Sequence, residues 1–146
     1  MRALARWRTR LRKAAVAAQA EVLRRVWGMD IGRGARISLK ARLDRTNPRG
    51  VHIGEDTGVG AGAVILTHDF VKSRHVDTRI GRHCHIGTNA MILPGVTVGD
   101  SCIVAPGSIV MRDVPAGSLV AGNPARVVES GLDLGPWGIR NWDGKR

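Results

Sequence analysis

The sequence predicts an all-β solenoid, a parallel β-helix of about four coils, preceded by an amphipathic α-helix. Three observations support this prediction. Aliphatic residues recur at every sixth position from Ile31 onward. Glycine is abundant at 19 residues while aromatic residues make up only 3% of the chain, which suits a thin repetitive core better than a thick sandwich or bundle. Residues 3–27, which precede the repeat, carry apolar side chains at helical spacing.

The first segment, residues 1–29, is predicted to be a basic amphipathic helix that stops near Gly28. It holds eight Arg or Lys residues against a single Glu21. Its apolar stripe consists of Leu4, Trp7, Leu11, Ala14, Ala18 and Val22. Because a short solenoid needs caps, we expect this stripe to pack on the first coil. Contact with an anionic membrane is the alternative, and both can hold if the stripe is shared.

The repeat consists of twelve hexads, and the first residue of every hexad is Ile, Leu or Val. The hexads begin at Ile31, Ile37, Leu43, Ile53, Val59, Ile65, Ile80, Ile86, Ile92, Val98, Val104 and Val110. The fifth position is small or β-branched in all hexads except those with Asn47 and Asp69, which precede the inserts 49–52 and 71–79. A period of six is neither the period of a helix nor the alternation of a half-exposed strand. A β-sandwich rich in glycine would require this period to be accidental.

Three hexads per turn give four coils, residues 31–48, 53–70, 80–97 and 98–115. Both inserts then follow the third hexad of a coil and should emerge from the same corner. Cys84 and Cys102 lie 18 residues apart at equivalent positions. We therefore expect them to stack as buried thiols that act as small hydrophobic side chains.

The repeat is lost toward the C-terminus, so the expected division is a helix (1–29), a β-helix domain (30–128) and a tail (129–146). Trp137 and Trp142 in the tail are expected to pack back on the β-helix or on a neighbouring subunit.

The run 80–128, with "PGVTVGD", "APGSIV" and "AGNPA", resembles the hexapeptide-repeat acyltransferases, in particular the maltose, galactoside and serine O-acetyltransferases. The stretches "LDRTNPRGVHIG" (43–54) and "ILTHDF" (65–70) resemble a subgroup associated with polysaccharide synthesis. The resemblance covers roughly 100 of the 146 residues. It implies a left-handed β-helix, a homotrimer and acetyl-CoA as the co-substrate, with no metal required.

His68 is the candidate catalytic residue. A hydroxyl is a weak nucleophile that needs a base to attack a thioester, and a neutral imidazole can take its proton. Thr67–His68 match the "TH" motif whose histidine is the base in the resembling enzymes. Asp69 is adjacent, but a backbone carbonyl is the better candidate to orient the ring. Asp44, Asn47 and Asp69 are the candidates for acceptor binding, and Asn47 can equally serve a turn.

The resemblance also places a coenzyme site along coils three and four, between neighbouring subunits. Its candidate residues are His85, Gly87, Thr88, Ala105, Gly107, Arg112 and Arg126. A pantetheine arm needs exposed backbone amides and little side-chain bulk, which the small residues offer, and the two arginines suit the phosphates of coenzyme A. The family often has an aromatic residue where His85 stands, so the packing there is open.

The predicted function is therefore acetyl-CoA-dependent O-acetylation of a sugar, a glycan precursor or a lipid-linked saccharide. Serine or amino-sugar acetylation is one alternative, and a non-catalytic scaffold docked through its basic helix is another. Zinc chemistry as in the γ-class carbonic anhydrases would need a set such as His68, His83 and His85, but the paired-histidine spacing of that family is absent.

Location and partners follow from composition. The net charge of +11 can attract anionic lipid or a polyanionic ligand. No nucleic acid is expected as a partner, because no finger, homeodomain or aromatic RNA-binding signature accompanies it. Two cysteines make no disulfide framework, and neither a signal peptide nor a membrane-spanning run is visible. A cytoplasmic protein is expected, with peripheral contact at the inner membrane face as an option and a mitochondrial transit sequence as a weaker one.

Overall fold

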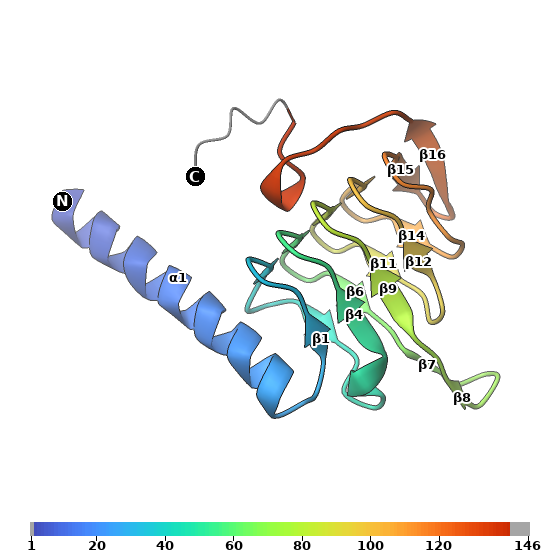
Figure 1. Cartoon of the computed structure of the whole chain (residues 1–146), viewed down its shortest axis with the longest axis horizontal. Coiled ribbons are helices and arrows are strands. Elements are labelled where there is room, and N and C mark those ends of the chain that lie inside the picture. The colour runs from blue at the N-terminus through green and yellow to red at the C-terminus, as the bar shows by residue number, and fades with distance from the viewer. Residues whose placement is uncertain (1, 141–146) are drawn as a thin grey trace.

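The computed structural model describes the backbone of residues 2–140 and the side chains of residues 4–140. Over this part of the chain, one helix is followed by a stack of coils (Figure 1). The elements are α1 (Arg2–Arg25), β1 (Asp30–Ile31), β2 (Arg36–Ile37), β3 (Arg42–Leu43), η1 (Pro48–Gly50), β4 (Val51–Ile53), β5 (Gly58–Val59), β6 (Val64–Ile65), β7 (His68–Asp69), β8 (Arg74–His75), β9 (Thr78–Ile80), β10 (His85–Ile86), β11 (Met91–Ile92), β12 (Thr97–Val98), β13 (Ile103–Val104), β14 (Ile109–Val110), β15 (Leu119–Gly122), β16 (Ala125–Glu129) and η2 (Pro136–Gly138).

Three sheets of parallel strands run along the stack, one on each side of the coils. Their orders are β1-β4-β9-β12, β2-β5-β10-β13-β15 and β3-β6-β11-β14. Each strand pairs with the strand at the same place in the next coil, so the first residues of the hexads stack in register. The stack on the second sheet is Ile37, Val59, Ile86, Val104 and Val120. The four predicted coils are confirmed, and a bridge at Val114 followed by β15 adds part of a fifth.

The interior of the coils follows the predicted pattern. All first-position residues of the hexads are buried except Leu43, which is half-buried. Cys84 and Cys102 are buried and in contact, as predicted, and both are free thiols. The contact with Cys102, together with burial, raises the pKa of the Cys84 thiol. Cys84 is therefore a structural residue that stays protonated.

In eight of the twelve hexads the bend comes at the fourth position, where the backbone has positive φ. The residues there are Gly34, Asp56, Gly62, His83, Asn89, Gly95, Ser101 and Gly107. Positive φ costs glycine little and is tolerated best among other residues by Asn, Asp and His. This position explains why the strands are short and why the period is six.

Helix α1 caps the first coil, but with the face opposite the predicted one. Ala20 and Leu23 are buried against the coil, and Arg24 donates hydrogen bonds to the carbonyl oxygens of Ile31 (Nε, 2.7 Å) and Gly32 (Nη2, 2.9 Å). These hydrogen bonds cover part of the open sheet edge of coil one. The face of α1 that packs on this edge carries the small side chain of Ala20, which allows close approach, and the guanidinium of Arg24, which donates to the edge carbonyls.

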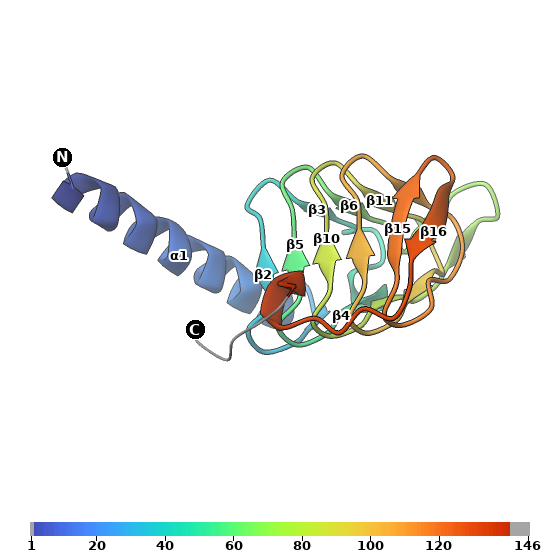
Figure 2. The same cartoon turned by 90° about the horizontal axis from the view of Figure 1, so that it is seen from above.

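The prediction that the apolar stripe packs on the first coil is wrong, since the stripe faces away from the coils. Its larger members are exposed: Leu4 by 83%, Trp7 by 65%, Leu11 by 58% and Val22 by 48%. Figure 2 shows α1 running away from the stacked coils toward its N-terminus, and residues 4–15 are all exposed. Among residues 2–140, no helix is both long and apolar enough to cross a membrane.

The far end of the solenoid is closed by β16, which pairs antiparallel with β15. The chain then returns along the second sheet to the first coil (Figure 2). There Trp137 donates from Nε1 to the Gly34 carbonyl oxygen at 2.8 Å, and the Arg36 guanidinium carbon lies 3.3 Å from its ring centroid. The predicted packing of Trp137 is confirmed, while Trp142 lies outside the described residues.

Candidate active site

A β-hairpin carries His68 away from the coils. After β6 in the third sheet the chain forms β7, which pairs antiparallel with β8 so that His68 lies opposite His75. The hairpin projects from the corner between the third and first sheets (Figure 1). His68 is half-buried and His75 is exposed. This corner is also the corner of the insert 49–52, as the shared phase of the two inserts predicts.

Asp44 fixes the backbone at His68. Its Oδ2 accepts hydrogen bonds from the backbone N–H groups of Thr67 and His68, both at 3.0 Å, and its Oδ1 accepts one from Thr46 at 2.8 Å. Burial alone would raise the pKa of Asp44, but these three backbone hydrogen bonds outweigh it and leave the pKa below its usual value. Asp44 therefore carries a negative charge that anchors the start of the hairpin.

We expect Asp44→Asn to destabilise the protein by about 1–3 kcal/mol at neutral pH, because an amide cannot accept all three hydrogen bonds. The expected loss of unfolding free energy is modest because Asp44 is partly exposed to solvent. A carboxylate whose pKa is lowered on folding stabilises the fold above its unfolded value, near 3.8, and loses this contribution as the pH falls through the folded value. Urea unfolding at neutral and acidic pH should therefore show the difference from wild type shrinking below about pH 4.

The matched control for this prediction is Asp133→Asn at an exposed position of the returning tail, which should change stability by less than about 0.5 kcal/mol. A difference between Asp44→Asn and wild type that stays the same at all pH values would show that the Asp44 charge does not stabilise the fold.

Asn47 closes the base of the same hairpin. Its Nδ2 donates to the carbonyl oxygens of Thr67 (3.1 Å) and Val76 (3.2 Å), and its own carbonyl oxygen accepts from Thr67 Oγ1 at 2.6 Å. Asp44 and Asn47 thus lie beside the candidate base, and both hold its backbone. Contact of either side chain with an acceptor stays a prediction.

The His68 ring lies among other rings of the hairpin. Its centroid is 5.2 Å from that of His75 and 6.2 Å from that of Phe70, both in edge-on arrangements. Phe70 is 85% exposed and so offers an apolar surface beside the imidazole. Sequence reasoning assigned no role to either neighbour. Only the hairpin register brings His75 back to His68, and no turn signature in the insert revealed it.

Asp69 turns to the hairpin loop and not to the His68 ring. Its Oδ1 accepts from the Lys72 backbone N–H at 3.0 Å, and its Oδ2 lies 3.8 Å from Arg74 Nε. These contacts close the loop. An acceptor-binding role for Asp69 stays a prediction.

The histidines considered for zinc do not form a cluster. His83 lies at a bend before β10 and His85 points outward from β10, whereas His68 lies on the hairpin. Within residues 2–140, no group of three or more His, Cys, Asp or Glu side chains is arranged to hold a metal ion.

Four of the predicted coenzyme residues lie at one corner of the coils, between the second and third sheets. They are Gly87, Thr88, Ala105 and Gly107. The backbone N–H of Gly107 donates to the Thr88 carbonyl oxygen at 2.9 Å, which joins coils three and four there. The N–H groups of Gly87 and Ala105 donate to the next coil, so these backbone donors are already used. A Cβ built at Gly107 would meet no atom within 4 Å, so the corner offers open space beside a narrow backbone ridge.

The remaining coenzyme candidates lie on other elements. Arg112 follows β14, and Arg126 lies on β16, where its Nη1 donates to the Ala125 carbonyl oxygen. Both arginines are exposed. His85 is exposed but lies beside the returning tail, since a Cβ at Gly138 would meet the His85 side chain. The described chain thus brings His85 against its own C-terminal segment.

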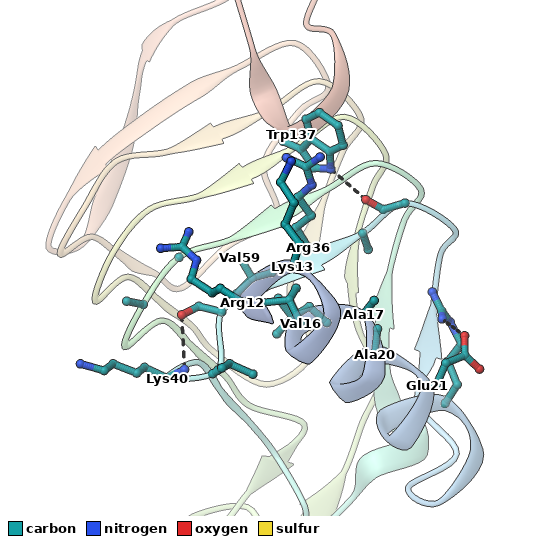
Figure 3. A pocket seen from close by; sticks show the side chains of 18 residues that line it. Arg12, Lys13, Val16, Ala17, Ala20, Glu21, Arg36, Lys40, Val59 and Trp137 are labelled. Atoms are coloured by element: carbon teal, nitrogen blue, oxygen red, sulfur yellow. Dashed lines mark hydrogen bonds and ion pairs between the residues drawn. The ribbon is translucent and has the colours of Figure 1, made fainter. Parts of the chain in front are cut away.

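A groove of about 960 Å³ lies between α1 and the first coils, away from the hairpin (Figure 3). Five cationic side chains line it: Arg12, Lys13, Arg36 and Lys40 at the rim, and Arg24, which is paired with Glu21. The rest of the lining is small or aliphatic apart from the Trp137 ring. Sequence reasoning did not find this groove, because it depends on the face that α1 turns to the coils.

Comparison with known proteins agrees with the repeat. The family model "Bacterial transferase hexapeptide (six repeats)" matches residues 77–112. YvoF of Bacillus subtilis (strain 168), a provisionally assigned acetyltransferase, is 35% identical over 102 residues, 68% of this chain and 59% of that protein. Serine acetyltransferase 2 of Arabidopsis thaliana is 38% identical over 110 residues, 70% of this chain and 33% of that protein. The chain thus spans about three fifths or less of these relatives.

Solved structures share the fold. A maltose O-acetyltransferase from Clostridium difficile 630 superposes with a TM-score of 0.61 and 22% identity, over 77% of this chain and 74% of that chain. A hexapeptide-repeat acetyltransferase of Vibrio cholerae in complex with acetyl-coenzyme A gives a TM-score of 0.57 and 23% identity, over 80% and 78%. The predicted left-handed parallel β-helix is thereby confirmed.

Proposed function

We propose that this chain, a bacterial-type hexapeptide-repeat protein with the left-handed β-helix fold, transfers an acetyl group from acetyl-CoA to a hydroxyl of a sugar, a glycan precursor or a lipid-linked saccharide. The donor is supported by the relatives named as acetyltransferases and by the acetyl-coenzyme A complex of a protein with the same fold. The hydroxyl acceptor is supported by the likeness to a maltose O-acetyltransferase.

The observation that carries this proposal is the fixed position of His68. Two residues of coil one, Asp44 and Asn47, make hydrogen bonds to the backbone at Thr67–His68, and the imidazole stands at the base of a hairpin that leaves the coils. Its ring lies edge-on to the rings of Phe70 and His75. A half-buried imidazole on a fixed backbone is what a general base requires.

In the proposed reaction a ring nitrogen of His68 takes the proton of the acceptor hydroxyl, and the oxygen attacks the thioester carbonyl carbon. The tetrahedral oxyanion would be held by backbone N–H donors other than those of Gly87, Ala105 and Gly107, which already donate within the coils. The carbon–sulfur bond then breaks, the acetyl group stays on the acceptor oxygen, and the sulfur leaves as a thiolate or takes the proton back from the imidazolium. No covalent intermediate on the enzyme is needed.

A homotrimer is part of the proposal. On β6, β11 and β14 of the third sheet the outward side chains are apolar and only half-buried in the single chain, namely Val64, Met91 and Ile109, while the outward residue of β3 is Arg42. A neighbouring subunit on such a face would bury this apolar surface and would form a groove along the coils. The corner with Gly107 and the cations Arg112 and Arg126 are proposed to hold coenzyme A there.

Serine or amino-sugar acetylation is the second candidate, favoured by the similarity to a serine acetyltransferase. The acceptor class can be tested by thiol release from acetyl-CoA with a panel of sugars, serine and glucosamine, followed by NMR of the product. We expect the highest kcat/KM with a sugar hydroxyl and an O-acetyl product. A preference for serine or for the amino group of glucosamine would overturn the proposed sugar hydroxyl acceptor but not the acetyl-CoA donor. Absence of both turnover and acetyl-CoA binding would support a non-catalytic scaffold.

A further inference from the structure

The outward face of α1 has no partner in the described chain. Its apolar side chains Leu4, Trp7 and Leu11 are more than half exposed and lie at spacings of three and four. We propose that this face docks the protein on an anionic phospholipid bilayer, with α1 lying along the surface. The proposal is independent of the acetyl-transfer activity.

Opposite faces of α1 make different contacts. The inner face, with Ala20, Leu23 and Arg24, is used by the first coil. The stripe lies on the opposite side, so packing on the β-helix leaves it free to contact another surface. An apolar stripe with Trp and Leu beside a strongly cationic polar face is the pattern of helices that lie in the membrane interface.

Charge favours lipid over a second copy of this chain. Residues 2–20 contain six Arg or Lys and no Asp or Glu, and Glu21 is paired with Arg24 and Arg25. Copies of such a helix packed side by side would repel one another, whereas anionic headgroups would be attracted. The cationic rim of the groove in Figure 3, with Arg12 and Lys13 from α1 and Arg36 and Lys40 from the first coil, extends the positive surface beside the same helix.

The test is flotation of the full chain with vesicles of phosphatidylcholine alone and of phosphatidylcholine mixed with phosphatidylglycerol. We expect binding to the mixed vesicles that weakens with added salt, and little binding to the neutral ones. Trp7→Ala/Leu11→Ala should lower partitioning about tenfold or more. Alanine has the highest helix propensity, so the helix itself should persist, as circular dichroism can check.

Val127→Ala/Val128→Ala is the matched control, because it removes exposed apolar surface from β16 at the far end of the β-helix. Its partitioning should equal that of wild type. The proposal is overturned if the full chain does not float with the mixed vesicles, or if the Trp7→Ala/Leu11→Ala variant floats as well as wild type. It is also overturned if this variant changes the oligomeric mass in light scattering with flotation unchanged, since the stripe would then be covered by a second copy.

Discussion

Replacement of His68 by alanine is expected to lower kcat for acetyl transfer by about 10²–10⁴-fold, the usual contribution of a positioned general base. Alanine keeps the backbone N–H that donates to Asp44, so the anchor of the hairpin is retained. The loss should therefore reflect the imidazole itself. The measurement is thiol release from acetyl-CoA at saturating acceptor, together with calorimetric binding of acetyl-CoA, which should be unchanged.

His75→Ala is the control for this experiment, because it removes the neighbouring imidazole of the same hairpin. We expect it to lower kcat less than tenfold, since His75 is the exposed member of the pair. A His68→Ala variant with wild-type kcat, or a larger loss with His75→Ala than with His68→Ala, would remove His68 from the role of base.

The second large effect concerns stability. Ile86→Ala is expected to lower the free energy of unfolding by about 2–5 kcal/mol, because the side chain is fully buried and its removal leaves a cavity between two coils. Ile86 stacks between Val59 and Val104, so the loss falls on both neighbouring interfaces. Each coil of a solenoid is stabilised mainly by its neighbours, and so the whole stack should unfold at a lower urea concentration.

Ile139→Ala removes the same atoms from an exposed position in the returning tail, where the side chain is 41% exposed. Urea unfolding followed by circular dichroism should show a change below about 1 kcal/mol for this variant. Equal effects of the two substitutions would mean that the first hexad position does not form the core.

The β-helix could be predicted from the sequence because the repeat fixes both faces of every strand. Once Ile37, Val59 and Ile86 are taken as equivalent, the sheets, the register and the stacked Cys84 and Cys102 follow. What the hexads do not fix is where the repeat stops. The residues after Val110 begin a further coil through Val114 and β15, but with a spacing that differs from six. This coil is not followed by another, because β16 pairs antiparallel with β15 at the end of the stack.

Helix α1 shows why a hydrophobic stripe alone does not decide packing. The stripe with Trp7 and Leu11 is the more apolar face, yet the first coil binds the face with Ala20 and Arg24. The deciding interactions are hydrogen bonds to sheet-edge carbonyls, which periodicity cannot reveal.

The candidate site was predicted in part. His68 could be singled out because an imidazole precedes the longest break in the repeat, and Asp44 and Asn47 lie beside it in the structure. The sequence did not reveal that these two side chains hold the backbone of the hairpin. It also did not reveal His75 as a neighbour, because the register of a hairpin is set by its turn and not by the hexad period.

The central claim is that the chain moves an acetyl group from acetyl-CoA to a hydroxyl, and it is tested most directly with acetyl-CoA labelled in the acetyl group. Purified protein is incubated with this donor and a sugar acceptor, and the acceptor is examined by mass spectrometry. We predict label on an acceptor oxygen and an equal amount of free coenzyme A thiol, both lost in His68→Ala. Absence of label from every acceptor tested, with no binding of acetyl-CoA, would contradict the claim.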